Sequence, residues 1–295
     1  MTARNSFGLP DLTGRTVVVT GATGGLGLAT TRALARAGAH VVLAVRDLAR
    51  GRAAARTVDG STEVRHLDLA DLASIRAFAD SWQGDLDVLI NNAGVMMPPE
   101  SATKDGFETQ FGVNHLGHFA LTNLLLRSLT DRVVTVSSVA HRSGRIRFDN
   151  PNLVGEYRAS LGYAQSKLAN LLFTLELQRR LTGIRSPVRA LAAHPGWSDT
   201  PLQSRVHNPV ARTLMVLGNK LVAQSSSAGA LPTLYAATQD LPGAAYVGPS
   251  GFKELRGAPT LVSRSPAASD AEAAKRLWEL SEELTGVRFP AELVR

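Results

Sequence analysis

Residues 16–27 read TVVVTGATGGLG, and the interpretation of the whole chain starts from this stretch. The valine triplet at 17–19 predicts a strand whose two sides are both covered by helices. Glycines at 21, 25 and 27 permit a tight turn, close approach to a pyrophosphate and close helix–strand packing. A helix that begins here would present free backbone amides to phosphate. The turn is therefore predicted to bind a dinucleotide through Gly21, Thr23, Gly24, Gly25, Leu26 and Gly27.

Downstream of this turn, short apolar runs alternate with amphipathic stretches. Strands are predicted at 40–45, 62–67, 88–91, 132–136, 188–193 and 244–247, and helices at 25–37, 48–58, 72–82, 108–129, 163–181 and 225–238. A capping box at 269–272 and Gly286 predict the limits of a last helix. The alternation predicts an α/β fold with one Rossmann-type, doubly wound parallel sheet and helices on both faces.

No internal repeat or linker divides the sequence, so residues 1–295 are predicted to form a single domain, with residues 1–12 as a flexible or loosely packed arm. Residues 197–224 interrupt the alternation with Pro, Gln, Asn and Arg around an apolar patch at 214–217. This segment is predicted to be an insertion that covers the substrate as a lid.

Composition excludes several classes of protein. The chain has 295 residues, of which 44% are hydrophobic and 19% charged, as in a globular protein rather than a disordered one. No window approaches the roughly 18 continuous apolar residues of a membrane span. The absence of cysteine excludes disulfides and thiolate catalysis. The formal net charge of +7 comes without interleaved aromatic residues or a recognition-helix pattern, so no nucleic-acid partner is expected. A start without a secretory signal predicts a cytoplasmic protein.

The residue after the second strand bears on the choice of cofactor. Arg46 lies 19 residues beyond Gly27, where an acidic residue would bind the ribose 2′-hydroxyl of NAD and an arginine the 2′-phosphate of NADP. Arg50 lies one helical turn further and could reinforce Arg46. Asp47 is the alternative ribose ligand if the strand ends one residue later, and Arg46 could also be an ordinary surface residue. NADP(H) is therefore preferred, and NAD(H) stays open.

Tyr163 and Lys167 occupy positions i and i+4 of one predicted helix and so share a face. A free phenol has a pKa near 10, and a neighbouring cation would lower it toward the range useful for proton transfer. Ser137 and Ser138 end the preceding strand, where a hydroxyl could bind a substrate oxygen. Because ligands of open α/β sheets bind at the carboxyl ends of the strands, these groups predict a catalytic site.

The motifs together resemble those of the short-chain dehydrogenase/reductase superfamily. TGATGGLG at 20–27, NNAG at 91–94, Asn114, Ser138, the Tyr163/Lys167 pair and Pro195-Gly196 follow its order and approximate spacing. NHLGHF at 114–119, VSSVAH at 136–141 and YAQSKLAN at 163–170 are most similar to the retinol-dehydrogenase-like branch, which includes the protochlorophyllide reductases. The resemblance covers about residues 12–295 and is strongest up to residue 200.

The resemblance implies an NADP(H)-dependent oxidoreductase that interconverts a carbonyl and an alcohol by hydride transfer. Tyr163 would be the general acid or base, and Lys167 would lower its pKa and hold the nicotinamide ribose. Ser138 rather than Ser137 would orient the substrate oxygen, and Asn114 would interrupt its helix and hold a water in a relay to Lys167. The further cofactor contacts would be Asp68 and Leu69 at the adenine, Asn92, Ala93 and Gly94 at the adenosine ribose, and Pro195, Gly196 and Thr200 at the nicotinamide and its phosphate.

The same residues are also compatible with a protein that binds a dinucleotide without catalysis. A non-catalytic dinucleotide sensor or partner-binding protein on the same fold is the alternative, and the complete Asn, Ser, Tyr and Lys set argues against it. No metal is expected, because His115 and His118 have no third ligand in reach. His141 and His194 are expected to have supporting roles near the pocket.

The substrate is predicted only as a class. Apolar residues in 139–162 and 197–224 favour a lipophilic carbonyl or alcohol. The lack of cysteine disfavours protochlorophyllide, and the lack of an N-terminal anchor argues against retinol. Because the helices that follow Glu108 and Tyr163 often form dimer or tetramer faces in the superfamily, a homo-oligomer stays open.

Overall fold

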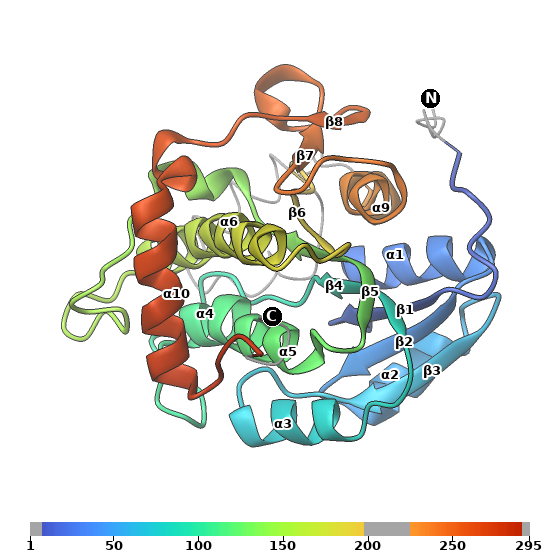
Figure 1. Cartoon of the computed structure of the whole chain (residues 1–295), viewed down its shortest axis with the longest axis horizontal. Coiled ribbons are helices and arrows are strands. Elements are labelled where there is room, and N and C mark those ends of the chain that lie inside the picture. The colour runs from blue at the N-terminus through green and yellow to red at the C-terminus, as the bar shows by residue number, and fades with distance from the viewer. Residues whose placement is uncertain (1–7, 198–224, 291–295) are drawn as a thin grey trace.

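A computed structural model describes residues 8–197 and 225–290 of the chain (Figure 1). One eight-stranded sheet runs through it in the order β3-β2-β1-β4-β5-β6-β7-β8. The strands are β1 (Thr16–Thr20), β2 (His40–Val45), β3 (Thr62–His66), β4 (Leu86–Asn91), β5 (Leu129–Val136), β6 (Arg189–Ala193), β7 (Tyr246–Pro249) and β8 (Pro259–Leu261). Neighbours from β3 to β7 pair in parallel, and β8 pairs antiparallel with β7. The predicted doubly wound sheet is confirmed.

Helices cover both faces of this sheet (Figure 1). They are α1 (Gly25–Arg36), α2 (Leu48–Ala55), α3 (Leu72–Asp80), α4 (Thr109–Phe111), α5 (Gly117–Leu125), α6 (Ala159–Gly183), α8 (Ser226–Gly229), α9 (Leu231–Thr238) and α10 (Ala271–Thr285). Shorter turns are the π-helical η1 (Gly112–Leu116) and the 3₁₀ turns η2 (Val139–Ser143), η4 (Phe252–Glu254) and η5 (Pro266–Ser269).

The valine triplet of β1 explains why the sheet needs two covering layers. Val17 and Val19 belong to one buried cluster, which includes residues of α1, α2 and α9. Val18 points the other way, into a cluster with residues of α3, α5, α6 and α10. All three side chains are at most 1% exposed, because successive residues of a strand face opposite sides. The apolar run therefore forms the middle of two cores at once.

The order of the strands fixes where a ligand can enter. From β1 the chain winds outward to β2 and β3, then crosses back to β4 and continues the other way. The parallel neighbours β1 and β4 thus lie at the point where the strand order reverses, with Val19 beside Ile90 near their carboxyl ends. A crevice opens at such a point in doubly wound sheets. The glycine-rich turn follows β1 directly.

Several predicted elements differ from the structure in their bounds or number. The single helix expected at 108–129 is divided into α4, η1 and α5, and β5 already begins at Leu129. Helix α2 ends at Ala55, earlier than expected. The antiparallel β8 was not predicted, because a strand of three residues has too short a pattern. The N-cap of α10 is Asp270, which accepts a hydrogen bond from the Ala273 amide at 3.0 Å, so the capping box predicted from Ser269 is wrong by one residue.

The two segments predicted to be an arm and a lid lie mostly outside the described residues, in 1–7 and 198–224. Of the arm, Leu9 and Leu12 pack against the core beside α1, and the Leu12 amide donates to the Ala37 carbonyl at 2.7 Å. Across the described ranges, no helix has the length and apolar character needed to cross a bilayer.

Candidate active site

The glycine-rich turn between β1 and α1 leaves the helix N-terminus open. Gly21 has a φ of +68°, and a side chain there would meet the backbone of Ala93 at 2.9 Å. A Cβ on Gly27 would likewise lie 2.6 Å from Nδ2 of Asn92. The N-cap Gly24 supplies no side-chain hydrogen bond to α1, and a Cβ there would meet nothing within 4 Å. The first amides of α1 are thus free of a side-chain cap and fit an anionic ligand.

Thr20 joins the ends of the two central strands, a role that the sequence did not predict. Its buried Oγ1 accepts hydrogen bonds from the amides of Asn92 and Ala93, both at 2.9 Å. The Asn92 side-chain amide donates to the Thr20 carbonyl at 2.8 Å. His118 Nε2 lies 2.9 Å from the same hydroxyl. These bonds fix the Asn92–Gly94 segment beside the glycine-rich turn, and only the proximity of two distant segments reveals them.

The residues predicted to contact the adenosine half follow β2 and β3. Arg46 and Arg50 are both exposed, and within the described part of the chain neither guanidinium has an ion pair or hydrogen bond. Asp47 is the N-cap of α2, with its Oδ1 accepting from the Arg50 amide at 3.0 Å. Asp68 is partly buried and accepts from the Ala70 amide, and Leu69 is buried. One oxygen of the Asp47 carboxylate is therefore engaged, whereas the two guanidinium groups have no partner among the described residues.

The two serines after β5 have different surroundings. Ser137 is buried, and its hydroxyl donates to the Lys167 carbonyl at 2.8 Å. Ser138 is partly exposed, and its hydroxyl acts on Tyr163 by lowering the pKa of the phenol. Its Oγ also accepts from the Ala140 amide at 3.2 Å. Ser138 is thus the serine that reaches the tyrosine, whereas Ser137 fastens the strand end to α6.

Lys167 and Tyr163 share one face of α6, with Lys167 Nζ 5.7 Å from the centre of the phenol ring. The ammonium is buried and donates to the Val136 carbonyl at 3.1 Å, and burial lowers its pKa to about 8. Burial also raises the pKa of Tyr163, and the Ser138 hydroxyl acts in the opposite direction. The sequence predicted that Lys167 lowers the pKa of Tyr163. In the chain by itself the pKa of Tyr163 is instead raised, because removal of the phenol from water has the largest effect on it.

Asn114 lies in the π-helical turn η1, where the predicted helix is interrupted. Its side chain is fully buried and bonds the Val95 backbone twice, accepting from the amide at 2.7 Å and donating to the carbonyl at 3.0 Å. It also donates to Ser166 Oγ at 2.9 Å. A Cβ on Gly94 would lie 3.2 Å from Asn114 Oδ1 and 3.6 Å from Lys167 Nζ. Gly94 therefore keeps open the space beside these two polar groups.

The turn after β6 carries the remaining predicted contacts. Gly196 has a φ of +66°, and its amide donates to His194 Nδ1 at 3.2 Å. The Trp197 amide donates to the Leu255 carbonyl at 2.8 Å. Pro195 and Gly196 thus lie at the carboxyl edge of the sheet, as Ser138 does. Thr200 lies outside the described residues.

His115 and His118 are core residues on η1 and α5. His115 Nε2 lies 2.9 Å from Ser281 Oγ of α10, and its ring contacts Phe111, Phe119 and Phe173. Burial lowers the pKa of His115 to about 3 and that of His118 to about 4, so both rings are neutral at pH 7. Within residues 8–197 and 225–290, no three His, Asp or Glu side chains lie together where they could hold a metal ion.

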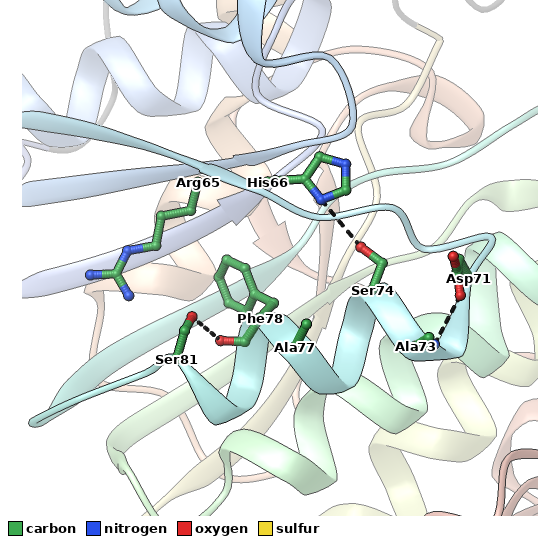
Figure 2. Close-up of a pocket in the computed structure, with 8 residues that line it drawn as sticks. All are labelled: Arg65, His66, Asp71, Ala73, Ser74, Ala77, Phe78 and Ser81. Atoms are coloured by element: carbon green, nitrogen blue, oxygen red, sulfur yellow. Dashed lines mark hydrogen bonds between the residues drawn. The ribbon is translucent and has the colours of Figure 1, made fainter.

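A hollow of about 550 Å³ lies elsewhere, along α3 and the edge strand β3 (Figure 2). Its polar groups are already engaged in local structure. Ser74 Oγ lies 3.4 Å from His66 Nδ1 and Ser81 Oγ donates to the Phe78 carbonyl, while Asp71 caps α3 (Figure 2). None of the predicted site residues lines this hollow, so it is separate from the candidate active site.

Comparison with known proteins agrees with this arrangement. The family model described as short chain dehydrogenase matches residues 15–211. The chain is 42% identical to retinol dehydrogenase 14 of Mus musculus, over 93% of this chain and 86% of that protein. It is 43% identical to retinol dehydrogenase 12 of Mus musculus, over 95% of this chain and 89% of that protein.

A solved structure extends the similarity to nearly the whole chain. The crystal structure of a putative uncharacterized protein from Mycobacterium Paratuberculosis is 53% identical and matches with a TM-score of 0.85, over 97% of this chain and 99% of that one. The branch is identified by the family model together with the curated relatives. The chain belongs to the short-chain dehydrogenase/reductase superfamily, in its retinol-dehydrogenase-like branch, and is an oxidoreductase of carbonyls and alcohols that uses a nicotinamide dinucleotide.

Proposed function

We propose that the protein transfers hydride between NADP(H) and the carbonyl or alcohol carbon of an apolar small molecule, with Tyr163 as general acid or base. The observation that carries the proposal is the convergence of Ser138, Tyr163 and Lys167. The Ser138 hydroxyl lowers the pKa of the Tyr163 phenol, and the Lys167 ammonium lies 5.7 Å from the centre of the phenol ring. A proton donor, a polarising hydroxyl and a cation are the groups that reduction of a carbonyl requires.

The residues around the crevice fit a dinucleotide. The uncapped N-terminus of α1 would hold the pyrophosphate, and the open space beside Gly94 borders Lys167 and Asn114. When bound, the nicotinamide supplies or accepts the hydride. The protein's own contribution is to orient the substrate oxygen through Ser138 and to give it a proton from the Tyr163 hydroxyl. In the reverse direction the phenolate takes the alcohol proton.

The preference for NADP(H) over NAD(H) rests on the segment after β2. The guanidinium of Arg46 is exposed, and within the described residues it has no competing carboxylate. Arg50 lies one helical turn further along the chain and is also exposed. Asp47, the alternative ribose ligand, uses its carboxylate to cap α2. Two free cations and an engaged carboxylate favour a 2′-phosphate over a 2′-hydroxyl.

An apolar substrate is the second part of the proposal. The segment 139–162 places Val154, 74% exposed, and Leu161, 36% exposed, on the surface next to the start of α6. Single exposed apolar side chains are ordinary on a protein surface, so these two support an apolar substrate only together with the curated relatives. The names of the curated relatives point to retinoids as one candidate class. We therefore include all-trans-retinal among the carbonyl compounds to be tested.

A two-stage experiment tests the proposal. The shift of the melting temperature with NADPH is compared with that of NADH, and the better cofactor is then used in a screen of aliphatic aldehydes, aromatic ketones and all-trans-retinal. We expect NADPH to stabilise more strongly and at least one apolar carbonyl to be reduced. Binding of NADPH without turnover of any compound would favour the sensor alternative, and equal or stronger stabilisation by NADH would refute the cofactor preference.

The proton-transfer role is tested with Tyr163→Phe, which removes only the hydroxyl. We expect a loss of turnover of about 10²-fold or more and an NADPH-induced shift in melting temperature close to that of the unmodified protein. Tyr235→Phe on α9, at the other side of the sheet, is the matched control and should leave turnover unchanged. Turnover by Tyr163→Phe at the rate of the unmodified protein would refute the assignment.

A further inference from the structure

The turn that carries Pro195 and Gly196 rests on the loop around η4, at residues 251–257. The Trp197 amide donates to the Leu255 carbonyl at 2.8 Å. A Cβ on Gly196 would collide with the carbonyl oxygens of Leu255 and Glu254, so the two backbones are in direct contact. The position of the turn is therefore set by a loop about 55 residues further along the chain.

This loop has an unusual backbone conformation. Lys253 and Glu254 are consecutive non-glycine residues with φ of +49° and +58°. The loop is closed by hydrogen bonds from the Gly251 amide to the Arg256 carbonyl at 2.9 Å and from the Leu255 amide to the Phe252 carbonyl at 3.2 Å. Left-handed backbone at two ordinary residues is unfavourable and persists only where surrounding contacts fix it. Here the conformation directs the Glu254 side chain toward the sheet edge.

The Glu254 carboxylate connects two segments of the candidate site. Its Oε1 accepts from the Arg142 guanidinium at 2.8 Å, and Arg142 lies in η2, four residues after Ser138. Its Oε2 lies 3.0 Å from Nε2 of His194, which is fully buried. One carboxylate thus contacts both the segment after the serine and the residue before Pro195.

A hydrogen bond from the Gly196 amide fixes the tautomer of His194. Because the Gly196 amide donates to Nδ1 at 3.2 Å, Nδ1 is unprotonated, and the ring proton lies on Nε2, which faces Glu254. The Nε2–Oε2 contact lies off the hydrogen-bond direction, and neither atom has another hydrogen bond among the described residues. Burial lowers the pKa of His194 to about 3, so the ring is neutral at working pH. The Gly196 amide therefore fixes the tautomer of a neutral imidazole, and the Glu254 carboxylate lies against the protonated Nε2 edge of the ring.

We propose that Glu254 is a positioning residue that holds the Pro195–Gly196 turn and the segment after Ser138 in a fixed relation. It acts through His194 on one side and Arg142 on the other. The inference rests on the proposed function and on the expectation, implied by the family resemblance, that this turn faces the nicotinamide. It assigns to Glu254 control of the nicotinamide half of the cofactor site and no effect on the half near Arg46.

The test compares two probes that share the adenosine end and differ at the nicotinamide end. NADPH has both ends, whereas 2′,5′-ADP lacks the nicotinamide. In calorimetric titrations, Glu254→Ala is expected to weaken NADPH binding by about tenfold, as expected for loss of a buried polar contact, and to leave 2′,5′-ADP binding within about twofold. Glu254→Gln, which keeps the size and one acceptor oxygen, should recover most of the NADPH affinity.

Two further variants complete the experiment. Glu156→Ala removes an exposed carboxylate that pairs with Arg147 at 3.4 Å, and it should change neither affinity. If Glu254→Ala does not fold, Arg142→Ala removes the ion pair between Arg142 and Glu254 by changing its more exposed partner. This variant should bind NADPH more weakly and retain its affinity for 2′,5′-ADP.

The other possible results contradict either the role of Glu254 or the proposed function. Equal loss for both probes, or no loss for NADPH, would overturn the positioning role. Failure of the unmodified protein to bind either probe would instead overturn the proposed function.

Discussion

The ammonium of Lys167 is buried and donates one hydrogen bond to the Val136 carbonyl, and its pKa is lowered by burial to about 8. In the unfolded chain the pKa returns to about 10.4. Between these values the unfolded chain binds more protons, so stability is lower below pH 8 and rises as the pH increases from 8 toward 10. The residue that the site needs as a cation therefore destabilises the fold at neutral pH.

This conflict predicts opposite effects of Lys167→Met on stability and on activity. At pH 7 we expect the free energy of unfolding to rise by ~1–3 kcal/mol, because a buried charge is replaced by an apolar chain of similar length. The Val136 carbonyl keeps its bond from Asn170 Nδ2 at 3.0 Å. Turnover should be lost. Urea unfolding at pH 7 and pH 10 measures the change, and a gain that does not shrink at pH 10 would contradict this explanation.

Arg46 is where a single residue should decide between the two nicotinamide cofactors. Arg46→Asp replaces a free cation with a carboxylate that repels a 2′-phosphate and can accept from a ribose hydroxyl. We expect the ratio of NADPH to NADH affinity to fall by about 10- to 100-fold. Arg52→Asp makes the same charge change at an exposed position of α2 and should leave the ratio unchanged in parallel titrations. An unchanged ratio in Arg46→Asp would place the phosphate elsewhere.

At the scale of elements, the interrupted helix from Thr109 to Leu125 connects the site with the outer layer. Its π-helical turn holds Asn114 toward Val95 and Ser166, and the neighbouring His115 faces Ser281 of α10. A π-helical turn inserts one extra residue and is frequent at functional sites. Because of this turn, Asn114 points toward the crevice while the adjacent His115 packs against α10.

Helix α10 should be the main stabiliser of that outer layer. Trp278 is 1% exposed, and its ring lies 4.9 Å from that of Phe119 and 5.8 Å from that of Phe173. Its Nε1 donates to Glu282 at 2.8 Å. We expect Trp278→Ala to lower the free energy of unfolding by about 3–5 kcal/mol and Trp278→Phe by clearly less, as urea unfolding would measure. A loss below about 1 kcal/mol for the alanine variant would show that α10 packs only weakly.

The position of α10 also bears on association. The helices that often form dimer faces in the superfamily correspond here to η1–α5 and α6. Trp278 packs against Phe119 of α5 and Phe173 of α6, and Arg180 of α6 lies over the Trp278 ring at 4.5 Å. Part of that surface is therefore covered by the chain's own helix.

For the molecule as a whole, buried neutral histidines predict acid sensitivity. Burial lowers the pKa of His115 and His194 to about 3 and that of His118 to about 4. Unfolding returns each to about 6.5, so the unfolded chain binds more protons below that value and stability falls as the pH is lowered from 6.5 toward 4. Each histidine should contribute up to about 1.4 kcal/mol per pH unit over this range.

Urea midpoints measured between pH 7.5 and pH 4.5 test this expectation. His115→Phe removes one group that takes up a proton on unfolding, so the decline of stability with pH should become shallower by about one proton. The same slope in the variant and in the unmodified protein would show that other groups cause the acid unfolding.

The local elements of this fold could be predicted because each depends on residues close together in the chain. The valine triplet, the glycine spacing at 21–27 and the i, i+4 pair Tyr163/Lys167 define a buried strand, a turn and a helix face without further information. The order of strands and helices followed from the same short-range patterns. Most misplaced boundaries, such as the division at η1 and the three-residue β8, lie where packing or pairing with distant residues overrides the local pattern.

The tertiary structure alone decided which distant groups meet and what burial does to them. Thr20 bonds Asn92 and Ala93 some 70 residues away, and Glu254 contacts Arg142 and His194 from a loop with no motif of its own. The Tyr163 pKa is raised and the Lys167 pKa lowered because folding removes both from water. Spacing in sequence fixes which residues share a helix face, but desolvation and long-range contacts depend on the packed molecule.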